Sequence, residues 1–261
     1  MRQAKDYIIV ALDVNDIEKA YRLVVDLRPH VGMFKVGLEL IWVIVGALLK
    51  GTSSEKETVV KLFDALGRDF FLDPKLKDIP HTLKNALAAI QRLSPRFVTV
   101  YADAGREGIR AAVEARGETD ILGVTVLTSF DEKSCKEVYE STSRKKKVVK
   151  YKVLQFADML YDCGAQGIVC SAQEVGILRG YERFNEMFMV VLGARSVWAS
   201  ANDQKRVRTL EDAILSGADY LVIGRQITNP PPEVGDSIKA AKMSAEEIGS
   251  GLAKRRRAYV V

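Results

Sequence analysis

The feature that most constrains the fold is a regular alternation of short apolar runs with amphipathic stretches. Each run is rich in β-branched or aromatic residues and nearly continuous in apolar character. Strands of a parallel sheet have this composition when helices cover the sheet. The predicted strands are the eight runs at residues 7–13, 33–37, 69–75, 97–103, 121–128, 167–171, 187–193 and 220–225.

Between the runs, apolar residues recur at helical spacing, most clearly over residues 17–24, 83–93 and 238–252. Strands alternating with helices along 261 residues predict a single (β/α)₈ barrel domain over residues 1–261. A polar excursion on the barrel rim is expected at about 131–150, and a basic tail at about 253–261. A doubly wound sheet is the alternative, but no Gly-x-Gly-x-x-Gly fingerprint follows a strand and there is no P-loop.

The net charge of +5 arises from two local runs of basic residues. These runs, at residues 144–147 and 254–257, hold eight positive charges, and without them the chain carries −3. A basic nucleic-acid-binding face spread over the whole fold is therefore disfavoured, and no nucleic-acid partner is expected. A non-catalytic nucleotide- or RNA-binding protein that uses the two runs remains an alternative.

The cysteines and apolar segments predict a cytoplasmic protein without a membrane partner. The three cysteines are an odd number and form no Cys-x-x-Cys pair, which argues against a disulfide framework. The two histidines are isolated, so no zinc-ligand spacing is present and no metal is expected. The longest apolar run, residues 40–49, would cover about 15 Å as a helix, half of a bilayer core, and predicts a buried helix.

Charged residues mark the carboxyl ends of several predicted strands, where barrel active sites gather. Asp13 ends the first strand and Lys35 lies in the second. Asp73 and Lys75, two apart in the third strand, are expected on one face, and the following turn supplies Asp78. An ammonium between carboxylates stays protonated, which favours a general acid or an electrostatic device over a Schiff base. A buried structural ion-pair network is the alternative.

A second group of residues predicts a phosphate site. Gly224 and Arg225 end the eighth strand, and Arg195 follows the seventh. Barrels often bind phosphate at this place, where a glycine lets the backbone N–H approach the anion and an arginine offers a planar fork. An ordinary loop with a surface arginine is the alternative for each half, but together they favour a phosphorylated ligand.

These residues resemble the signature of the orotidine 5'-phosphate decarboxylase family. The central motif is Asp73-x-Lys75-x-x-Asp78-Ile79-Pro80-x-Thr82. The other matching segments, in the order of the family, are residues 11–13, 35–37, 124–129, 169–172, 203–206 and 217–220. The resemblance covers about residues 7–227. Its Asp-x-Lys-x-x-Asp core is shared with sugar-phosphate decarboxylase relatives, whereas Ile-Pro-x-Thr and the Asp-Gln pair at 203–204 are more specific.

The resemblance implies a dimeric (β/α)₈ enzyme that converts orotidine 5'-phosphate into uridine 5'-phosphate and CO2 without metal or organic cofactor. Lys75 would then protonate the carbon that loses CO2, and Asp73 would lie against the departing carboxylate. Lys35 and Asp13 would hold the ribose hydroxyls. Asp78 and Thr82 would reach the active site of the neighbouring subunit.

The resemblance also assigns the rest of the substrate site. Thr128 and Ser129 would read the base, while the phosphate would be bound by Arg195, Gln204, the Gly224 amide and Arg225. A related sugar-phosphate lyase or decarboxylase on the same barrel, of a kind that typically needs Mg²⁺, is the second hypothesis.

The sequence departs from the family pattern at several positions. Pro74 stands between Asp73 and Lys75, where an apolar residue other than proline is usual. It removes an N–H from a strand expected to be paired on both sides, so we expect it to shift the array and lower activity. Tyr101 stands where histidine is frequent, and Val191-Leu192 where Thr-Pro is common.

Overall fold

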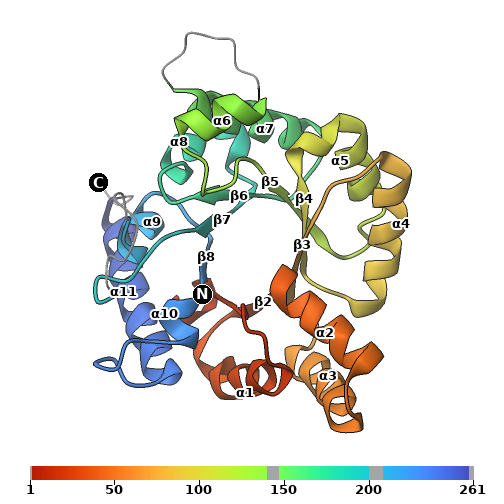
Figure 1. Ribbon diagram of the computed structural model, residues 1–261. Helices are drawn as coiled ribbons and strands as arrows, with labels where there is room; N and C mark the ends of the chain where they lie inside the picture. The colour runs from red at the N-terminus through yellow and green to blue at the C-terminus, as the bar shows by residue number, and fades with distance from the viewer. Residues whose placement is uncertain (1, 140–146, 200–207, 259–261) are drawn as a thin grey trace.

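The apolar runs form a closed parallel barrel in the computed structural model, which describes residues 2–139, 147–199 and 208–258. Every strand pairs with the next along the chain, and β1 pairs with β8 to close the ring (Figure 1). The (β/α)₈ prediction is confirmed. The strands are β1 (Ile8–Ala11), β2 (Met33–Gly37), β3 (Phe70–Leu76), β4 (Phe97–Tyr101), β5 (Asp120–Val124), β6 (Gly167–Ser171), β7 (Phe188–Leu192) and β8 (Tyr220–Ile223).

Helices surround the ring on its outer side, as Figure 1 shows. The helices are α1 (Ile17–Leu27), α2 (Leu38–Lys50), α3 (Ser53–Leu66), α4 (Pro80–Ile90), α5 (Gly105–Glu114), α6 (Glu132–Tyr139), α7 (Val148–Asp162), α8 (Val175–Arg179), α9 (Leu210–Leu215), α10 (Arg225–Thr228) and α11 (Ser237–Ala258). Short 3₁₀ turns are η1 (Ala4–Tyr7), η2 (Arg28–His30), η3 (Gln91–Leu93), η4 (Ala102–Ala104) and η5 (Glu182–Phe184).

Most strands end earlier than the sequence predicts. β2 and β6 have the predicted bounds, but β1, β4, β5, β7 and β8 stop short at their carboxyl ends. Asp13, Thr128 and Arg225 therefore lie in the segments that follow the strands rather than in the strands themselves. The apolar or extended character of a sequence continues past the last ladder hydrogen bond, so composition alone places the strand ends too late.

The barrel interior is filled by apolar side chains at its amino-terminal end. Phe97 lies at the centre of an aromatic group, with ring centroids 6.2 Å from Phe71, 5.6 Å from Phe188 and 5.4 Å from Tyr220. A second and larger apolar cluster lies between the strands and the outer helices. The interior of the barrel is thus filled with apolar side chains below the carboxyl ends of the strands.

The predicted buried helix at residues 40–49 is α2, and its burial is only partly as predicted. Leu40, Ile44 and Ala47 are buried, whereas Trp42 is 68% exposed and Leu49 is 71% exposed. One face of α2 packs on the sheet and on α3, and the other face carries apolar residues to the surface. Across the described residues, no helix is long and apolar enough to cross a membrane.

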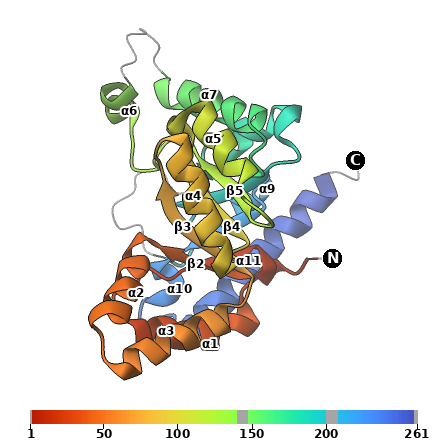
Figure 2. The same cartoon turned by 90° about the vertical axis from the view of Figure 1, so that its right-hand side faces the viewer.

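The two predicted peripheral segments lie at different ends of the molecule. Figure 2 shows α6, which begins the predicted rim excursion, on the side opposite to the N-terminal segment and the end of α11. Residues 140–146, with most of the first basic run, lie outside the described residues. The second basic run belongs to α11, which continues to Ala258; there Lys254 pairs with Glu211 of α9 at 2.6 Å.

Candidate active site

Inward-facing side chains change from apolar to polar toward the carboxyl ends of the strands. Alternate residues of a strand point to the same face, so the residue two positions after an interior residue also points inward. The last apolar interior residues of five strands are Ala11, Met33, Phe71, Phe97 and Val222. The residues two positions further along are Asp13, Lys35, Asp73, Thr99 and Gly224. The strand register therefore gathers polar groups at one end of the barrel.

Four of the charged side chains form a continuous chain of ion pairs. The Lys35 Nζ lies 3.1 Å from Asp13 Oδ1 and 3.4 Å from Asp73 Oδ2. The Lys75 Nζ donates to Asp73 Oδ1 at 2.5 Å. The side chains of Lys35 and Asp73 are buried, while that of Lys75 is 22% exposed and that of Asp13 is 48% exposed. We call these four residues the ion-pair array.

Gly37 has no Cβ, and the array occupies the space that a Cβ would fill. A Cβ at this position would lie 2.5 Å from the Lys35 Nζ and 3.0 Å from Asp13 Oδ1. Both distances are shorter than van der Waals contact allows. Any side chain here would therefore push the Lys35 ammonium out of its place between the two carboxylates.

Pro74 lies in a bulge of β3, so the expectation of a strand paired on both sides at this residue is wrong. The pairing with β4 shifts between Leu72 and Leu76, which face Val98 and Val100. Between these two pairs β3 covers four residue positions and β4 only two. Pro74 lies in the extra length of β3, where no backbone N–H is required for pairing. Lys75, the next residue, has a positive φ of 55°, a conformation that non-glycine residues seldom adopt.

Thr99 of β4 supports this bulge and was missed by the sequence analysis. Its Oγ1 accepts a hydrogen bond from the Lys75 backbone N–H at 3.0 Å and donates to Asp73 Oδ1 at 2.7 Å. The side chain is fully buried. One hydroxyl therefore fixes both the backbone of Lys75 and the carboxylate that pairs with its ammonium. Threonine is common in strands, so its presence in β4 is no signal of function. The one available signal was that Thr99 lies two residues after the interior residue Phe97 and therefore points into the barrel.

The surroundings of Asp73 keep its carboxylate ionised. Burial by itself would raise the pKa of Asp73. The ammonium groups of Lys75 and Lys35 and the hydrogen bonds from Lys75 and Thr99 outweigh burial, and the pKa lies below its ordinary value. The array thus holds a fixed negative charge between two positive ones.

Asp78 and Thr82 do not join the array within the chain. Both residues are exposed, and the Asp78 carboxylate accepts a hydrogen bond from the Ile79 backbone N–H at 2.7 Å. The sequence placed Asp78 in the alternating array, but the carboxylate that completes the ion pairs on Lys35 is that of Asp13. Asp78 lies in the turn after β3 and is exposed, so the alternation of inward and outward side chains along the strand does not apply to it.

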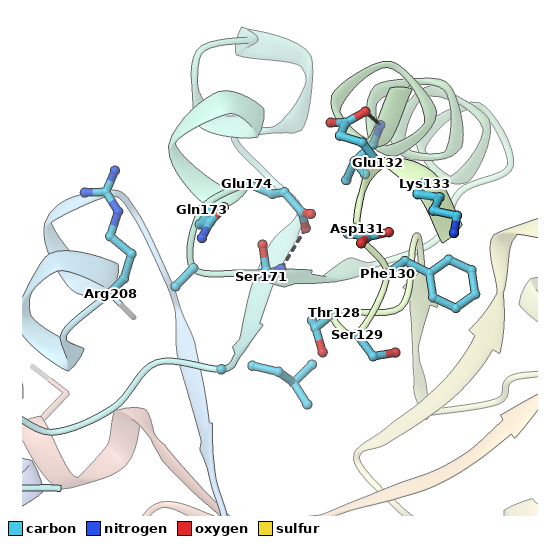
Figure 3. A pocket seen from close by; sticks show the side chains of 14 residues that line it. Thr128, Ser129, Phe130, Asp131, Glu132, Lys133, Ser171, Gln173, Glu174 and Arg208 are labelled. Atoms are coloured by element: carbon cyan, nitrogen blue, oxygen red, sulfur yellow. Dashed lines mark hydrogen bonds between the residues drawn. The ribbon is translucent and has the colours of Figure 1, made fainter. Parts of the chain in front are cut away.

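A cavity of about 770 Å³ opens at the carboxyl ends of β5, β6 and β7. Figure 3 shows Thr128 and Ser129 on the turn after β5, with Ser171 at the end of β6 and Glu174 on the segment that follows. Burial raises the pKa of Glu174, although its carboxylate accepts a hydrogen bond from the Ser171 backbone N–H at 2.8 Å. The predicted base-reading pair therefore lines a space large enough for a small ligand.

The predicted phosphate-binding residues that the structure describes follow β7 and β8. A Cβ at Gly224 would lie 3.9 Å from Asp13 Oδ2, so the end of β8 borders the array. Arg225 begins α10 and is exposed. Arg195 is half-buried, and its backbone forms a bridge with Thr209. Gln204 lies outside the described residues.

Metal-ligating side chains do not cluster in the part of the chain that the structure describes. No group of three or more His, Cys, Asp or Glu residues is placed there to hold a metal ion. The acidic members of the array, Asp13 and Asp73, each contact the Lys35 ammonium.

Fold and site together define the class of protein: a (β/α)₈ barrel with a lysine–aspartate array at the carboxyl ends of its strands. Comparisons with known proteins then identify the family. The sequence model of the Orotidine 5'-phosphate decarboxylase / HUMPS family matches residues 6–240. The chain belongs to this family.

Individual relatives agree with this assignment. The chain is 39% identical to the orotidine 5'-phosphate decarboxylase of Thermobifida fusca, over 92% of this chain and 94% of that protein. It is 37% identical to the corresponding enzyme of Syntrophomonas wolfei, over 91% of this chain and 97% of that protein. The crystal structure of orotidine 5'-phosphate decarboxylase from Lactobacillus acidophilus superposes with a TM-score of 0.68 at 27% identity, covering 92% of this chain and 98% of that one.

Proposed function

We propose that this protein decarboxylates orotidine 5'-phosphate to uridine 5'-phosphate and CO2, as a carbon–carbon lyase of pyrimidine nucleotide biosynthesis. The observation that carries the proposal is the Lys75 ammonium, held 2.5 Å from the buried Asp73 carboxylate at the open end of the barrel. Two proteins named orotidine 5'-phosphate decarboxylase, 39% and 37% identical to the chain over more than nine tenths of its length, support the proposal.

The reaction needs a group that both stabilises negative charge and supplies a proton. When the bond to the carboxylate breaks, its electron pair stays on the pyrimidine carbon, where no conjugated system absorbs it. A fixed ammonium stabilises this carbanion electrostatically and then transfers its proton to the carbon. Lys75 is the ammonium of the array with more exposed surface, and we assign it this role.

Asp73 acts on the departing group. Its carboxylate is held ionised by the two lysines, as its lowered pKa indicates. A substrate carboxylate placed beside it would be repelled by about 4 kcal/mol at a separation of ~4 Å and an effective dielectric constant of ~20, before any relaxation. Loss of CO2 relieves that repulsion, so Asp73 favours the decarboxylated state over the bound substrate.

The remaining predicted residues are assigned to binding. Lys35 and Asp13 hold the ribose hydroxyls and fix the array. Thr128 and Ser129 read the base from the cavity beside β5. The phosphate is bound by residues that follow β7 and β8, namely Arg195, Gln204, the Gly224 amide and Arg225. Binding energy from this remote phosphate can align the reacting carbon with Lys75.

We further propose a homodimer in which Asp78 and Thr82 complete the partner's active site. Three observations support this arrangement. Asp78 and Thr82 are exposed on the turn and helix after β3. Ile79 between them is 65% exposed. On neighbouring α2, which begins at the same end of the barrel, Leu38 is 50% exposed and Trp42 is 68% exposed. Apolar surface beside a site of this kind is typical of an interface.

Complementation between two inactive variants tests the dimer. Lys75→Ala and Asp78→Ala each lose activity in this arrangement. Subunits mixed after dissociation form heterodimers in which one of the two sites has both native residues, so activity returns. If Asp78 acted within its own subunit, every site in the mixture would lack one residue and the mixture would stay inactive.

The assay of the proposed reaction is direct. Purified protein with a metal chelator should deplete the absorbance of orotidine 5'-phosphate and release uridine 5'-phosphate. A chelator-sensitive activity on a sugar phosphate would instead indicate the second hypothesis, the Mg²⁺-dependent branch of the barrel family. No turnover, together with no thermal protection by uridine 5'-phosphate, would contradict the proposal.

The proposed location is the cytoplasm, and no nucleic-acid partner is proposed. All three cysteines are buried and unpaired, which fits a reducing compartment. Part of the basic run on α11 is engaged with α9, because Arg255 donates to the Ile214 carbonyl at 3.5 Å in addition to the Lys254–Glu211 pair. RNA binding that is sensitive to salt and lost on deletion of residues 254–257 would support the nucleic-acid alternative.

A further inference from the structure

Gln226, the residue directly after Arg225, bridges two loops at the carboxyl end of the barrel. Its Oε1 accepts a hydrogen bond from the Ser196 backbone N–H at 2.7 Å. Its Nε2 donates to the Ala194 carbonyl at 3.1 Å. These two partners are the residues on either side of Arg195. The side chain of Gln226 therefore brackets the backbone of Arg195 from the neighbouring β8–α10 segment.

We propose that Gln226 is a positioning residue that fixes the spacing between Arg195 and Arg225 for the phosphate of the substrate. The proposal deepens the proposed function and rests on its phosphate site. The two arginines follow different strands, Arg195 after β7 and Arg225 after β8, so their relative position depends on contacts between these two segments. A pair of hydrogen bonds from the residue next to Arg225 to both neighbours of Arg195 sets it directly. We call this pair the Gln226 clamp.

The clamp belongs to a segment that is held from several directions. The Arg195 backbone N–H donates to the Arg208 carbonyl at 3.1 Å. The Glu247 carboxylate of α11 accepts from the Val197 N–H at 3.3 Å and from the Leu210 N–H at 3.0 Å. These contacts anchor the loop to its own far end and to α11. The clamp adds a direct link from this loop to the segment that carries Arg225.

Both polar atoms of the Gln226 amide are engaged with backbone groups, so we assign it no direct contact with substrate. It acts through the backbone of Arg195. Replacement of Gln226 would leave both arginine side chains present but remove the hydrogen bonds that link their two segments. A group with this role should affect binding of the phosphate more than binding of the nucleoside part.

Gln166 provides a matched control at the opposite end of the barrel. Its Oε1 accepts from the Ile121 N–H at 2.8 Å, and its Nε2 donates to the Gly164 carbonyl at 2.6 Å. This is the same pair of backbone hydrogen bonds, placed just before β6 and far from the open end. If glutamine clamps serve stability alone, the two residues should behave alike.

The experiment compares Gln226→Met and Gln166→Met, which keep the length of the side chain and remove both hydrogen bonds. Affinities for uridine 5'-phosphate and for uridine are measured by calorimetry, and thermal unfolding by circular dichroism. We expect both variants to unfold at a lower temperature than the wild type. We expect Gln226→Met alone to weaken uridine 5'-phosphate binding about tenfold, with uridine binding unchanged and with KM for orotidine 5'-phosphate raised more than kcat is lowered.

Three results would overturn the proposal: unchanged affinity of Gln226→Met for uridine 5'-phosphate, equal weakening of nucleotide and nucleoside, or the same weakening in Gln166→Met. If Gln226→Met fails to fold, Gln226→Asn, whose amide is one methylene too short to reach both partners, is measured with the same expectation. A wild-type protein that binds uridine 5'-phosphate but does not decarboxylate the substrate overturns the proposed function and leaves the clamp standing. A wild-type protein that does not bind the nucleotide overturns both.

Discussion

The two ends of the barrel each contain a partly buried cluster of charges, and the partners of these charges differ. At the amino-terminal end, Arg179 pairs with Asp219 at 2.6 Å and also donates to the carbonyls of Gly217, Phe184 and Met187. At the carboxyl end, the charged side chains of the array are paired mainly with one another.

This difference is the one expected between a structural network and a site that binds a ligand. The Arg179 guanidinium binds the backbone before β7 and β8, and its hydrogen bonds leave little capacity for a ligand. Most contacts of the array are instead made between its own side chains, and Lys75 and Asp13 are partly exposed at the barrel opening. A ligand can therefore compete for these groups, which favours a binding or catalytic role over the alternative of a purely structural ion-pair network.

The largest effect on stability is expected at the amino-terminal cluster. Arg179→Met leaves Asp219 partly buried without its cation and frees several backbone carbonyls. The free energy of unfolding should fall by about 3 kcal/mol, at the low end for a broken buried pair because both side chains are partly exposed. Urea denaturation measures this loss. The kcat of the folded fraction should stay unchanged. A large loss of kcat would contradict the assignment of this cluster to stability alone.

The reverse pattern is expected at Gly37. In Gly37→Ala the new methyl group displaces the Lys35 ammonium, which lies at the end of a flexible side chain, so folding is little affected. Turnover should fall on the order of 10²-fold, because small misplacements within a catalytic array are costly.

Gly46→Ala is the matched control for Gly37→Ala, since a Cβ at Gly46 in α2 meets nothing within 4 Å. It should keep full turnover and gain up to ~1 kcal/mol in the free energy of unfolding. Equal activity of the two alanine variants would show that the position of Lys35 does not matter.

A smaller effect on catalysis is expected at Thr99. Thr99→Val keeps the shape of the side chain but removes the hydrogen bonds to the Lys75 N–H and the Asp73 carboxylate. We expect kcat to fall about tenfold, with Thr99→Ser restoring most of it because the hydroxyl returns. Steady-state kinetics checks this, and failure of serine to rescue would assign the loss to packing instead.

The smallest effect concerns Glu174, which lines the cavity at the carboxyl ends of β5, β6 and β7. Its raised pKa means that ionisation is less favourable in the folded than in the unfolded state, so the charge costs stability at neutral pH. Glu174→Gln should therefore raise the free energy of unfolding at pH 7 by less than about 1 kcal/mol, which a small rise in the unfolding temperature would report. The gain should vanish below about pH 4, where the glutamate is protonated in both states. A gain that persists at low pH would contradict the assignment.

Much of the fold could be predicted because the strands of a covered barrel are continuous apolar runs. Met33–Gly37 and Gly167–Ser171 have the predicted bounds for that reason. The charged residues after the runs correctly indicated Lys35, Asp73 and Lys75 as neighbours, since parallel strands end at the same rim.

The remaining features of the site depend on contacts between strands. The bulge at Pro74 is a change of register against β4, and the positive φ of Lys75 follows from it, so neither is written in the local sequence. The role of Thr99 depends on facing that bulge. Gln226 is meaningful only because β7 and β8 bring its loop against Ala194 and Ser196.

The most direct test of the account is turnover of orotidine 5'-phosphate by Lys75→Ala, measured beside Lys77→Ala. Lys77 lies two residues further along, is exposed and pairs with Asp103 at 2.8 Å, so it controls for loss of a lysine in this segment. The account predicts that Lys75→Ala folds and binds uridine 5'-phosphate but loses turnover on the order of 10⁴-fold or more, whereas Lys77→Ala stays active. A Lys75→Ala protein that retains the wild-type rate would contradict it.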